Sequence, residues 1–172
     1  SLVEFYGAAF VQSGFHVKTI NQLNTQEKIV ALTFDDGPDA ENTPKILALL
    51  EKFNAKATFF CIGKKIAGQE KSVQQIIEQG HEIGNHSFEH SPMYDLKNKK
   101  QFIADLTLAN ESLEKVLGKK PTYFRPPYGV TTPGLGSACR ELNFKVIGWN
   151  VRSLDTATPD KNKVVERVMQ KV

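Results

Sequence analysis

The sequence predicts an α/β protein in which helices cover a parallel sheet, and three observations support this prediction. Short apolar runs rich in β-branched residues alternate along the chain with amphipathic segments of helical period. The same order recurs in both halves of the chain. Thr-Pro pairs, which make good helix starts, follow the expected strands at Thr43-Pro44, Thr132-Pro133 and Thr158-Pro159. Such alternation indicates parallel strands, because a helix is the usual crossover between them.

The expected strands end at clusters of polar or turn-forming residues. They are Lys28–Phe34, Ala57–Cys61, Glu82–Gly84, Thr122–Phe124 and Phe144–Trp149. The longest helix is expected from Lys97 to Leu117, because its apolar residues recur at steps of four and three and Gly118 follows as a stop signal. Neither GxGxxG nor GxxxxGK[ST] occurs, which favours a barrel over a doubly wound nucleotide-binding sheet.

Two parts of the chain are expected to differ in role. Residues 1–25 are predicted to form an extended strand or hairpin that packs on the barrel, and residues 26–172 to form the barrel domain. The first part is rich in aromatic residues, namely Phe5, Tyr6, Phe10 and Phe15. Three valines near the other end have no predicted partner, so we expect the barrel to lack its last strand and motif. These are Val164, Val165 and Val168.

Length and composition exclude several classes of protein. The chain has 172 residues, 40% of them hydrophobic, and a formal net charge of +3, as expected for one folded domain. So small a charge does not indicate nucleic acid as a partner. Cys61 and Cys139 are too few for a disulfide framework or a cysteine-rich zinc module. No apolar run is long enough to span a membrane.

Charged and titratable residues gather where four of the expected strands end. In an α/β barrel, the loops at the carboxyl ends of the strands meet on one face and carry the catalytic groups. The residues that fall on such loops are Asp35, Asp36, His86, His90, Arg125, Tyr128 and Asp155. This convergence predicts an active site rather than a set of unrelated surface residues.

Taken alone, each feature has a structural explanation, since Asp-Asp-Gly-Pro forms turns and paired histidines are often surface residues. Together, Asp36, His86 and His90 form a two-histidine, one-carboxylate set that suits zinc or non-haem iron(II). Asp35 favours a zinc hydrolase, because hydrolysis needs a base beside the metal and zinc lowers the pKa of bound water to about 7. Arg125 is the residue expected to keep Asp35 ionised.

Three segments resemble the first three motifs of the NodB-like polysaccharide deacetylases, which are carbohydrate esterase family 4. They are Thr33–Pro38 (TFDDGP), His86–His90 (HSFEH) and Arg125–Tyr128 (RPPY), each after an expected strand and in the family's order. The resemblance implies an irregular (β/α) barrel, usually seven-stranded. It also implies metal-dependent removal of N-acetyl groups from N-acetylglucosamine in peptidoglycan or chitin-like polymers, although some relatives cleave O-acetyl esters on xylan.

Transferred residue by residue, the resemblance makes Asp35 the general base, oriented by Arg125. The ligands of Zn²⁺, with Co²⁺ or Ni²⁺ as alternatives, would be Asp36, His86 and His90.

Two aromatic residues are implied to face the substrate. The backbone N–H of Tyr128 would help to stabilise the oxyanion, a contribution of about 2.7–4 kcal/mol. The ring of Tyr128 or Trp149 would lie against a sugar face, although Trp149 is as readily explained as a core residue at a strand end.

The chain departs from the family pattern in two places. Where the fourth motif usually reads Asp-x-x-Asp-Trp, this chain has Arg152-Ser153-Leu154-Asp155-Thr156. Asp155 matches the second aspartate, which helps to tune the general acid, whereas Arg152 adds a cation that would favour a more anionic glycan. The fifth motif, Leu-x-Leu-His, is absent, and we interpret this as a trimmed chain rather than a lost acid. General acid catalysis contributes about 10²–10⁴-fold.

Three functions are consistent with these motifs. The first is an N-acetylglucosamine deacetylase, the second an O-acetyl ester hydrolase on xylan-like glycans, and the third a metal-retaining, glycan-binding protein without turnover. The expected partner is an N-acetylated glycan. Because polymeric cell-wall glycans lie outside the membrane, we expect an extracytoplasmic location, whether periplasmic, cell-surface or secreted. Any membrane anchor would precede residue 1.

Overall fold

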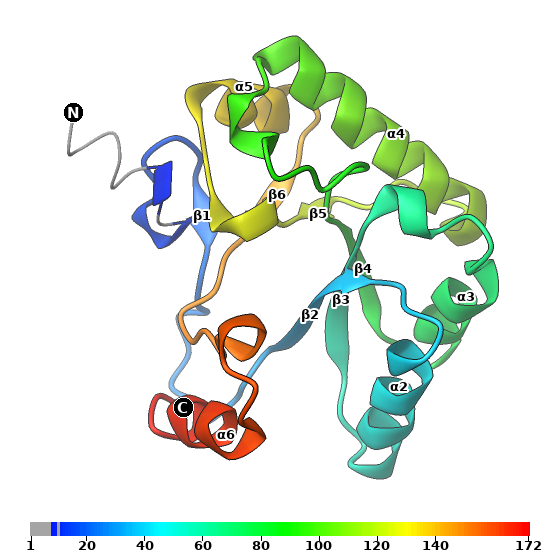
Figure 1. Cartoon of the computed structure of the whole chain (residues 1–172), viewed down its shortest axis with the longest axis vertical. Helices are drawn as coiled ribbons and strands as arrows, with labels where there is room; N and C mark the ends of the chain where they lie inside the picture. Colours follow the sequence, from blue (N-terminus) through cyan, green and yellow to red (C-terminus); the bar gives the residue numbers. More distant parts are fainter. Residues whose placement is uncertain (1–7, 10) are drawn as a thin grey trace.

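The centre of the molecule is a parallel sheet with the strand order β1-β6-β5-β4-β3-β2 (Figure 1). The computed structural model describes residues 8, 9 and 11–172. The strands are β1 (Thr19–Ile20), β2 (Leu32–Gly37), β3 (Ala57–Cys61), β4 (Glu82–Asn85), β5 (Tyr123–Phe124) and β6 (Lys145–Ile147). The parallel α/β fold is confirmed. Within the described chain the sheet stays open between β1 and β2, which is compatible with an incomplete barrel.

Helices α2 to α5 follow one another around the outside of the sheet, while α6 lies apart from them near the C-terminal end (Figure 1). The helices are α2 (Asn42–Lys52), α3 (Glu70–Glu78), α4 (Lys99–Leu117), α5 (Pro133–Glu141) and α6 (Lys161–Met169). Short 3₁₀ turns connect several elements, namely η1 (Val11–Ser13), η2 (Gly63–Lys65), η3 (Tyr94–Leu96), η4 (Pro127–Gly129) and η5 (Asp155–Ala157). None of the helices described combines the length and the apolar composition that crossing a bilayer requires.

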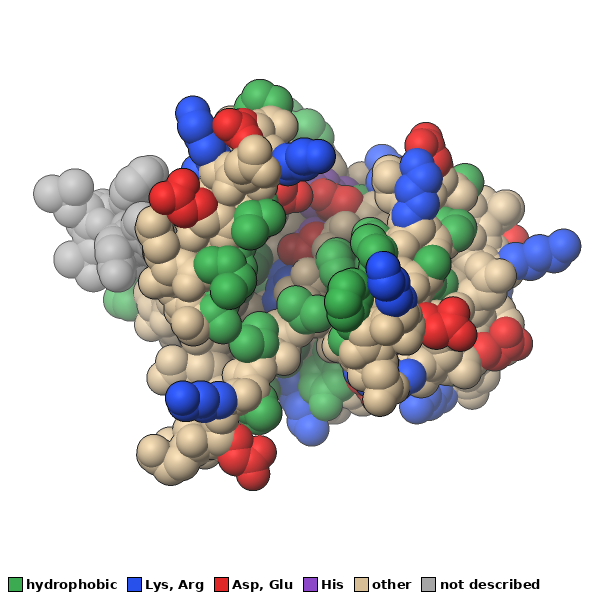
Figure 2. All heavy atoms as spheres, turned by 90° about the horizontal axis from the view of Figure 1, so that it is seen from below, with side chains coloured by type: hydrophobic (Ala, Val, Ile, Leu, Met, Phe, Trp, Pro, Cys, Tyr) green, Lys and Arg blue, Asp and Glu red, His purple; other side chains and the backbone are tan. Residues whose placement is uncertain are grey.

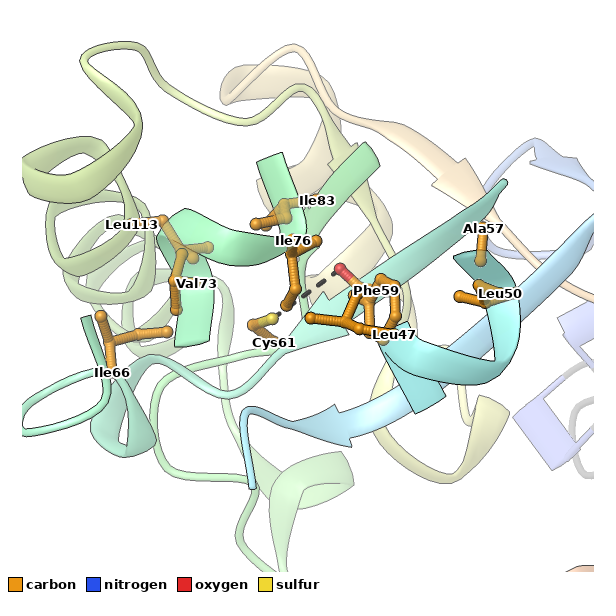
Figure 3. Packing of buried hydrophobic residues seen from close by; sticks show 10 residues of the cluster. All are labelled: Leu47, Leu50, Ala57, Phe59, Cys61, Ile66, Val73, Ile76, Ile83 and Leu113. Atoms are coloured by element: carbon orange, nitrogen blue, oxygen red, sulfur yellow. Dashed lines mark hydrogen bonds between the residues drawn. The ribbon is translucent and has the colours of Figure 1, made fainter. Parts of the chain in front are cut away.

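Two clusters of buried side chains form the core, and α4 contributes to both. The first joins α2, β3, α3 and β4, whose side chains point toward one another and toward Leu113 of α4 (Figure 3). The second joins α4, β5, α5 and β6 around Phe102, Leu106 and Phe124. The predicted stripe of α4 is confirmed at Phe102, Leu106, Ala109 and Leu113, which are fully buried. Helix α4 therefore holds the two sides of the sheet together.

Two large apolar side chains of the helices stay at the surface. Phe53 is 70% exposed, because it follows the last residue of α2. Val165 of α6 is also exposed, as expected for valines without a predicted partner. Both cysteines are buried and free.

Only one of the three Thr-Pro pairs acts as the expected helix cap. Thr132 caps α5 by accepting a hydrogen bond from Leu135 N at 3.2 Å. Helix α2 instead begins before Thr43, and the Asp39 carboxylate accepts the free backbone N–H groups at its start. Helix α6 is capped by Asp160. In the two other cases an aspartate near the pair supplied the stronger acceptor.

The N-terminal segment contributes β1, which pairs in parallel with β6 at the edge of the sheet. Phe15 of this segment is 54% exposed, so it does not pack on the sheet as expected. Phe5, Tyr6 and Phe10 lie outside the described residues. The division between residues 1–25 and 26–172 stays a prediction.

Candidate metal-dependent active site

The carboxyl ends of four strands bring most of the predicted site residues together. Asp35 and Asp36 lie in β2, and the remaining side chains follow β4, β5 and β6, namely His86, His90, Arg125, Tyr128 and Trp149. Figure 2 shows a hollow in the molecule, with hydrophobic side chains along both sides and acidic, basic and histidine side chains inside it. Since parallel strands place their carboxyl ends on one edge, this grouping is what the strand order dictates.

A β-bulge directs the side chains of the two adjacent aspartates toward different partners. The register of β2 against β3 shifts between Phe34 and Gly37, and Asp36 takes a left-handed backbone conformation with φ 67°. Neighbouring residues of a regular strand point to opposite faces, whereas a bulge re-aims a side chain. Asp35 therefore faces Arg125 while Asp36 faces the histidines. The sequence had suggested that the strand stops at Phe34, which is wrong, because it continues through both aspartates to Gly37.

Asp36, His86 and His90 meet in the arrangement that a metal ion requires. One potential ligand atom from each residue lies within 4.8 Å of the other two. The Asp36 Oδ1 atom is 3.5 Å from His86 Nε2 and 3.1 Å from His90 Nε2. The His86 side chain is 3% exposed and that of Asp36 is 52% exposed, so the group is buried on one side and open on the other. A site of this shape leaves room for water or substrate.

A hydrogen bond to the backbone sets the orientation of the His86 ring. Its Nδ1 atom lies 2.7 Å from the backbone oxygen of Arg125, and an N–H at Nδ1 donating to that carbonyl leaves the lone pair on Nε2. That lone pair points to the side of Asp36. The contact therefore gives His86 the tautomer that ligates a metal through Nε2.

Buried polar side chains hold the loop that carries the histidines. Asn85 Oδ1 accepts from Ser87 N at 2.7 Å, and Ser87 Oγ accepts from His90 N at 3.0 Å. Asp105 of α4 accepts from Phe88 N at 3.0 Å. Ser87 and His90 both have positive φ angles, which non-glycine residues rarely adopt without such support.

The charges of the triad favour the protonation states that bind a cation. The adjacent His86 side chain, with smaller contributions from His90 and Lys65, holds the pKa of Asp36 below its ordinary value despite partial burial. Burial lowers the pKa of His90, and the proximity of His86 adds to this effect. An ionised carboxylate and neutral imidazoles are the forms in which these side chains act as ligands.

Asp35 is held by a buried arginine rather than by the triad. Arg125 Nη1 donates to Asp35 Oδ1 at 2.8 Å and to Thr33 Oγ1 at 2.7 Å. Its other nitrogens donate to the backbone oxygens of Gly148 and Ile147 at 2.8 and 3.3 Å. Burial lowers the pKa of Arg125, while the Asp35 carboxylate opposes that change. With nearly all its donors directed at protein oxygens, the guanidinium fixes the position of Asp35.

Tyr128 and Trp149 frame the same site. Tyr128 sits in η4 with φ 59° and its ring centroid lies 4.8 Å from that of His90. The Trp149 ring packs directly on Gly129, where a Cβ atom would lie 2.5 Å from the ring, and it also faces Arg125 at 5.4 Å. Trp149 thus packs at the rim of the site, and its contact with a sugar face stays a prediction.

Asp155 is placed differently from the other predicted residues. It is exposed in η5, where its carboxylate accepts a hydrogen bond from Ser153 Oγ. In the part of the chain that is described, its contacts are therefore made within its own loop. A role for Asp155 in the chemistry stays a prediction.

Sequence reasoning missed the residues that support the loop and the backbone of β2. Asn85 and Asp105 are buried polar residues, and Lys65 Nζ donates to the backbone oxygen of Asp36 at 2.8 Å. A signal for Asp105 was present, because it interrupts the apolar face of α4 directly beside Leu106. A buried carboxylate on such a face requires partners, which here are two backbone N–H groups and Lys97.

Comparison with known proteins decides the family. The sequence profile of the family described as polysaccharide deacetylase matches residues 22–147. The chain belongs to the polysaccharide deacetylase family. It is 36% identical over 140 residues to a peptidoglycan-N-acetylglucosamine deacetylase of Bacillus cereus, covering 81% of this chain and 50% of that protein. The family membership inferred from the three motifs is thus confirmed.

Solved structures of this deacetylase family have the same fold. The peptidoglycan deacetylase PdaC of Bacillus subtilis superposes with a TM-score of 0.79 at 33% identity, covering 86% of this chain and 71% of that one. A pseudoenzyme of the family from Bacillus anthracis gives 0.77 at 28% identity, covering 86% and 52%. This chain spans half of the length of the Bacillus cereus relative, and the family contains members without activity as well as enzymes.

Proposed function

We propose that this chain hydrolyses the N-acetyl group of an amino sugar in peptidoglycan or a chitin-like glycan, using a divalent cation. The proposal rests on two groups of side chains that lie side by side at the carboxyl edge of the sheet. Asp36, His86 and His90 converge as a ligand set, and Asp35 is held beside them by Arg125. The names of the relatives, which are peptidoglycan deacetylases, support the substrate class.

The donor atoms of the triad fit zinc. One carboxylate oxygen and two imidazole nitrogens form the usual set of a catalytic zinc site, and the tautomer of His86 suits it. Asp36, His86 and His90 would hold the ion, which would polarise the acetyl carbonyl and the attacking water when bound. Cobalt and nickel take the same nitrogen and oxygen ligands.

Asp35 would act as the general base. A base that removes a proton from the attacking water must be fixed in position, and the hydrogen bond from Arg125 Nη1 provides this condition. The iron(II) oxygenases that share this type of ligand set have no need of such a base. The Asp35–Arg125 pair is thus what favours hydrolysis.

The backbone around Tyr128 would stabilise the developing oxyanion. Its N–H belongs to the Pro127–Gly129 turn, in which Tyr128 has a left-handed conformation. Strain of this kind is retained where a backbone group must face a substrate. The exposed ring of Tyr128, packed on His90, would form one wall of the sugar site.

Proton donation to the leaving amine has no histidine assigned to it in this chain. His86 and His90 belong to the triad, His81 hydrogen bonds to Ala57 N at the other end of the sheet, and His16 packs on Phe15.

Acetate release tests the proposal. Zinc-loaded protein is incubated with chitin oligomers, with peptidoglycan glycan strands and with acetylxylan, and free acetate is measured. Release from the amino-sugar polymers but not from acetylxylan supports N-deacetylation, while the reverse supports the O-acetyl ester hydrolase. Binding of zinc and glycan with no release from any substrate would overturn the enzymatic proposal in favour of a glycan-binding protein.

The same proposal implies where the domain works. Polymeric cell-wall glycans lie outside the cytoplasmic membrane, so the domain would act in the periplasm, at the cell surface or after secretion. Protease accessibility of the domain in intact cells tests this placement. Protection from protease until the cytoplasmic membrane is disrupted would contradict it.

A further inference from the structure

The segment that precedes residue 22 lies outside the part of the chain that matches the deacetylase profile, yet it contacts two loops of the site. The backbone oxygen of Ala8 accepts a hydrogen bond from Thr131 N at 3.0 Å, just after the turn η4. The backbone oxygen of Ile20, in β1, accepts one from Gly148 N at 2.9 Å. The segment is therefore joined both to the loop that follows β5 and to the loop that follows β6.

Val11 is the most buried side chain that the structure describes in this segment, with an exposed fraction of 1%. Its Cγ1 atom lies 3.6 Å from the position that a Cβ atom would take on Gly129. The same Cγ1 atom lies 3.3 Å from the corresponding position on Gly148. Val11 therefore packs between the loop after β5 and the loop after β6.

The turn against which Val11 packs has an unfavourable backbone conformation. Tyr128 and Gly129 follow one another with φ angles of 59° and 69°. A tyrosine in the left-handed region persists only where the surrounding structure holds it there. The side chains that crowd Gly129 are those of Trp149, whose ring lies 2.5 Å from the Cβ position, and Val11. Val11 is thus one of the groups that stabilise this turn.

Val11 is itself fixed to the sheet. Thr19 Oγ1 donates to the backbone oxygen of Val11 at 2.8 Å, and it accepts from Asn21 Nδ2 at 3.1 Å. Thr19 belongs to β1, which pairs in parallel with β6. A continuous set of contacts therefore runs from the edge of the sheet through Val11 to Gly129.

We propose that Val11 positions the Pro127–Gly129 turn, and with it the backbone N–H of Tyr128, for stabilisation of the oxyanion. This inference rests on the proposed function. Val11 acts through Gly129 rather than on the substrate, so it is a positioning residue. A donor stabilises an oxyanion only when it is held where the charge develops, and a displacement of about 1 Å costs about 10²-fold in rate.

Val11→Ala tests the assignment, because it removes the methyl groups that lie against the two glycines. The kcat for acetate release should fall by about 10-fold, while KM and zinc affinity should change by less than about 2-fold. Val17→Ala is the matched control, since Val17 is a buried valine of the same segment that packs in the second core cluster. Both variants should unfold at a lower temperature, but the control should keep kcat within about 2-fold of the wild type.

Hydrogen exchange measures the support of the turn without any catalysis. The amides of Gly129 and Val130 are hydrogen-bonded within the turn. Their exchange should be about 10-fold faster in Val11→Ala and less than about 2-fold faster in Val17→Ala. Thr19→Val, which removes the hydroxyl that donates to Val11, is a milder variant. It should show the same changes at smaller size, and it decides the assignment if Val11→Ala does not fold.

Faster exchange in the turn together with a lower kcat in Val11→Ala, with neither change in Val17→Ala, supports the assignment. Equal losses of kcat in the two variants overturn it. Faster exchange with an unchanged kcat overturns it as well, because Val11 then has only a structural role. If the wild-type protein releases no acetate, the deacetylase proposal fails and the catalytic role of Val11 with it. Unchanged exchange in Val11→Ala would refute the support of the turn whether or not the protein is an enzyme.

Discussion

Strands β2 and β4 carry the side chains that converge on the proposed metal position, whereas β5 and β6 carry those that surround Asp35 and the rim. On the first side, Asp36 and His90 are open to solvent to different degrees and only His86 is deeply buried. On the second side, Arg125 is 3% exposed and nearly all its donors are directed at protein oxygens. The two sides also draw on different core clusters, joined by α4.

This difference indicates that the first side binds the metal ion and the second side orients Asp35. The first side offers lone pairs that an incoming ion can take. The second side offers a guanidinium whose geometry is complete without any ion. Substitutions on the first side should therefore alter the affinity for the metal. Substitutions on the second side should alter the turnover rate at unchanged metal content.

The largest effect is expected from removal of a ligand. Asp36→Ala and His86→Ala should weaken zinc binding by more than about 100-fold, because loss of a mere supporting partner already costs about 10–100-fold. Acetate release should disappear with the metal. Competition with a chromophoric chelator measures the affinity, and Glu89→Gln, an exposed change in the same loop, should leave it unchanged. Wild-type affinity in both alanine variants would refute the ligand assignment.

Replacement of the base should separate chemistry from metal binding. Asp35→Asn keeps the shape of the side chain but cannot accept the proton of water, so turnover should fall by about 10²–10⁴-fold at full zinc occupancy. Metal analysis and acetate release on the same sample provide the measurement. The control is Asp95→Asn, an exposed acid in η3. Loss of zinc in Asp35→Asn would place Asp35 among the ligands instead.

Arg125→Lys should have a smaller effect on the rate and a visible effect on stability. Lysine cannot reproduce the fork that reaches Asp35, Gly148 and Ile147, so Asp35 is held less well. We expect kcat to fall by about 10- to 100-fold with little change in KM or zinc affinity. Thermal unfolding should show a loss of about 1–3 kcal/mol, since buried carbonyl groups lose their donors. An unchanged kcat in a destabilised protein would limit Arg125 to a structural role.

The smallest predicted effect concerns His81, at the opposite end of β4 from the site. Burial lowers the pKa of His81, and its Nδ1 accepts from Ala57 N at 3.3 Å. The unfolded state therefore takes up the proton first as the pH falls below about 6.5, and stability decreases from there down to the folded pKa. His81→Gln should reduce the free energy of unfolding that is lost between pH 7.5 and pH 5, by less than about 1.4 kcal/mol.

Chemical denaturation of the zinc-free protein at both pH values measures the effect. His16→Gln serves as the control, because His16 lies in the segment just before β1 and contacts Phe15 rather than the core around β4. An identical pH dependence for wild type and His81→Gln would contradict the prediction.

Much of the site could be predicted from the sequence because its residues come in short, ordered motifs. Asp36, His86 and His90 follow strands that the apolar pattern had already located, and parallel strands place such residues on one edge. The convergence of Arg125 with Asp35 follows from the same rule. The helix stripe of α4 could likewise be predicted, since its buried residues keep the helical period.

Other features depend on contacts between distant parts of the chain. The bulge at Asp35–Asp36 depends on the register with β3, which no local pattern specifies. The cap of α2 depends on which of two nearby acceptors, Asp39 or Thr43, reaches the free N–H groups. The support of the histidine loop by Asp105 joins residues seventeen positions apart, and only folding brings them together.

Whether Asp36, His86 and His90 bind one metal ion is tested by the zinc X-ray absorption spectrum of the protein loaded with one equivalent of zinc. We expect a single bound zinc with nitrogen and oxygen neighbours at about 2.0–2.2 Å and the outer-shell scattering of two imidazole rings, a signal that His86→Ala should lose together with most of the bound zinc. A spectrum without imidazole scattering, or one that His86→Ala leaves unchanged, would contradict it.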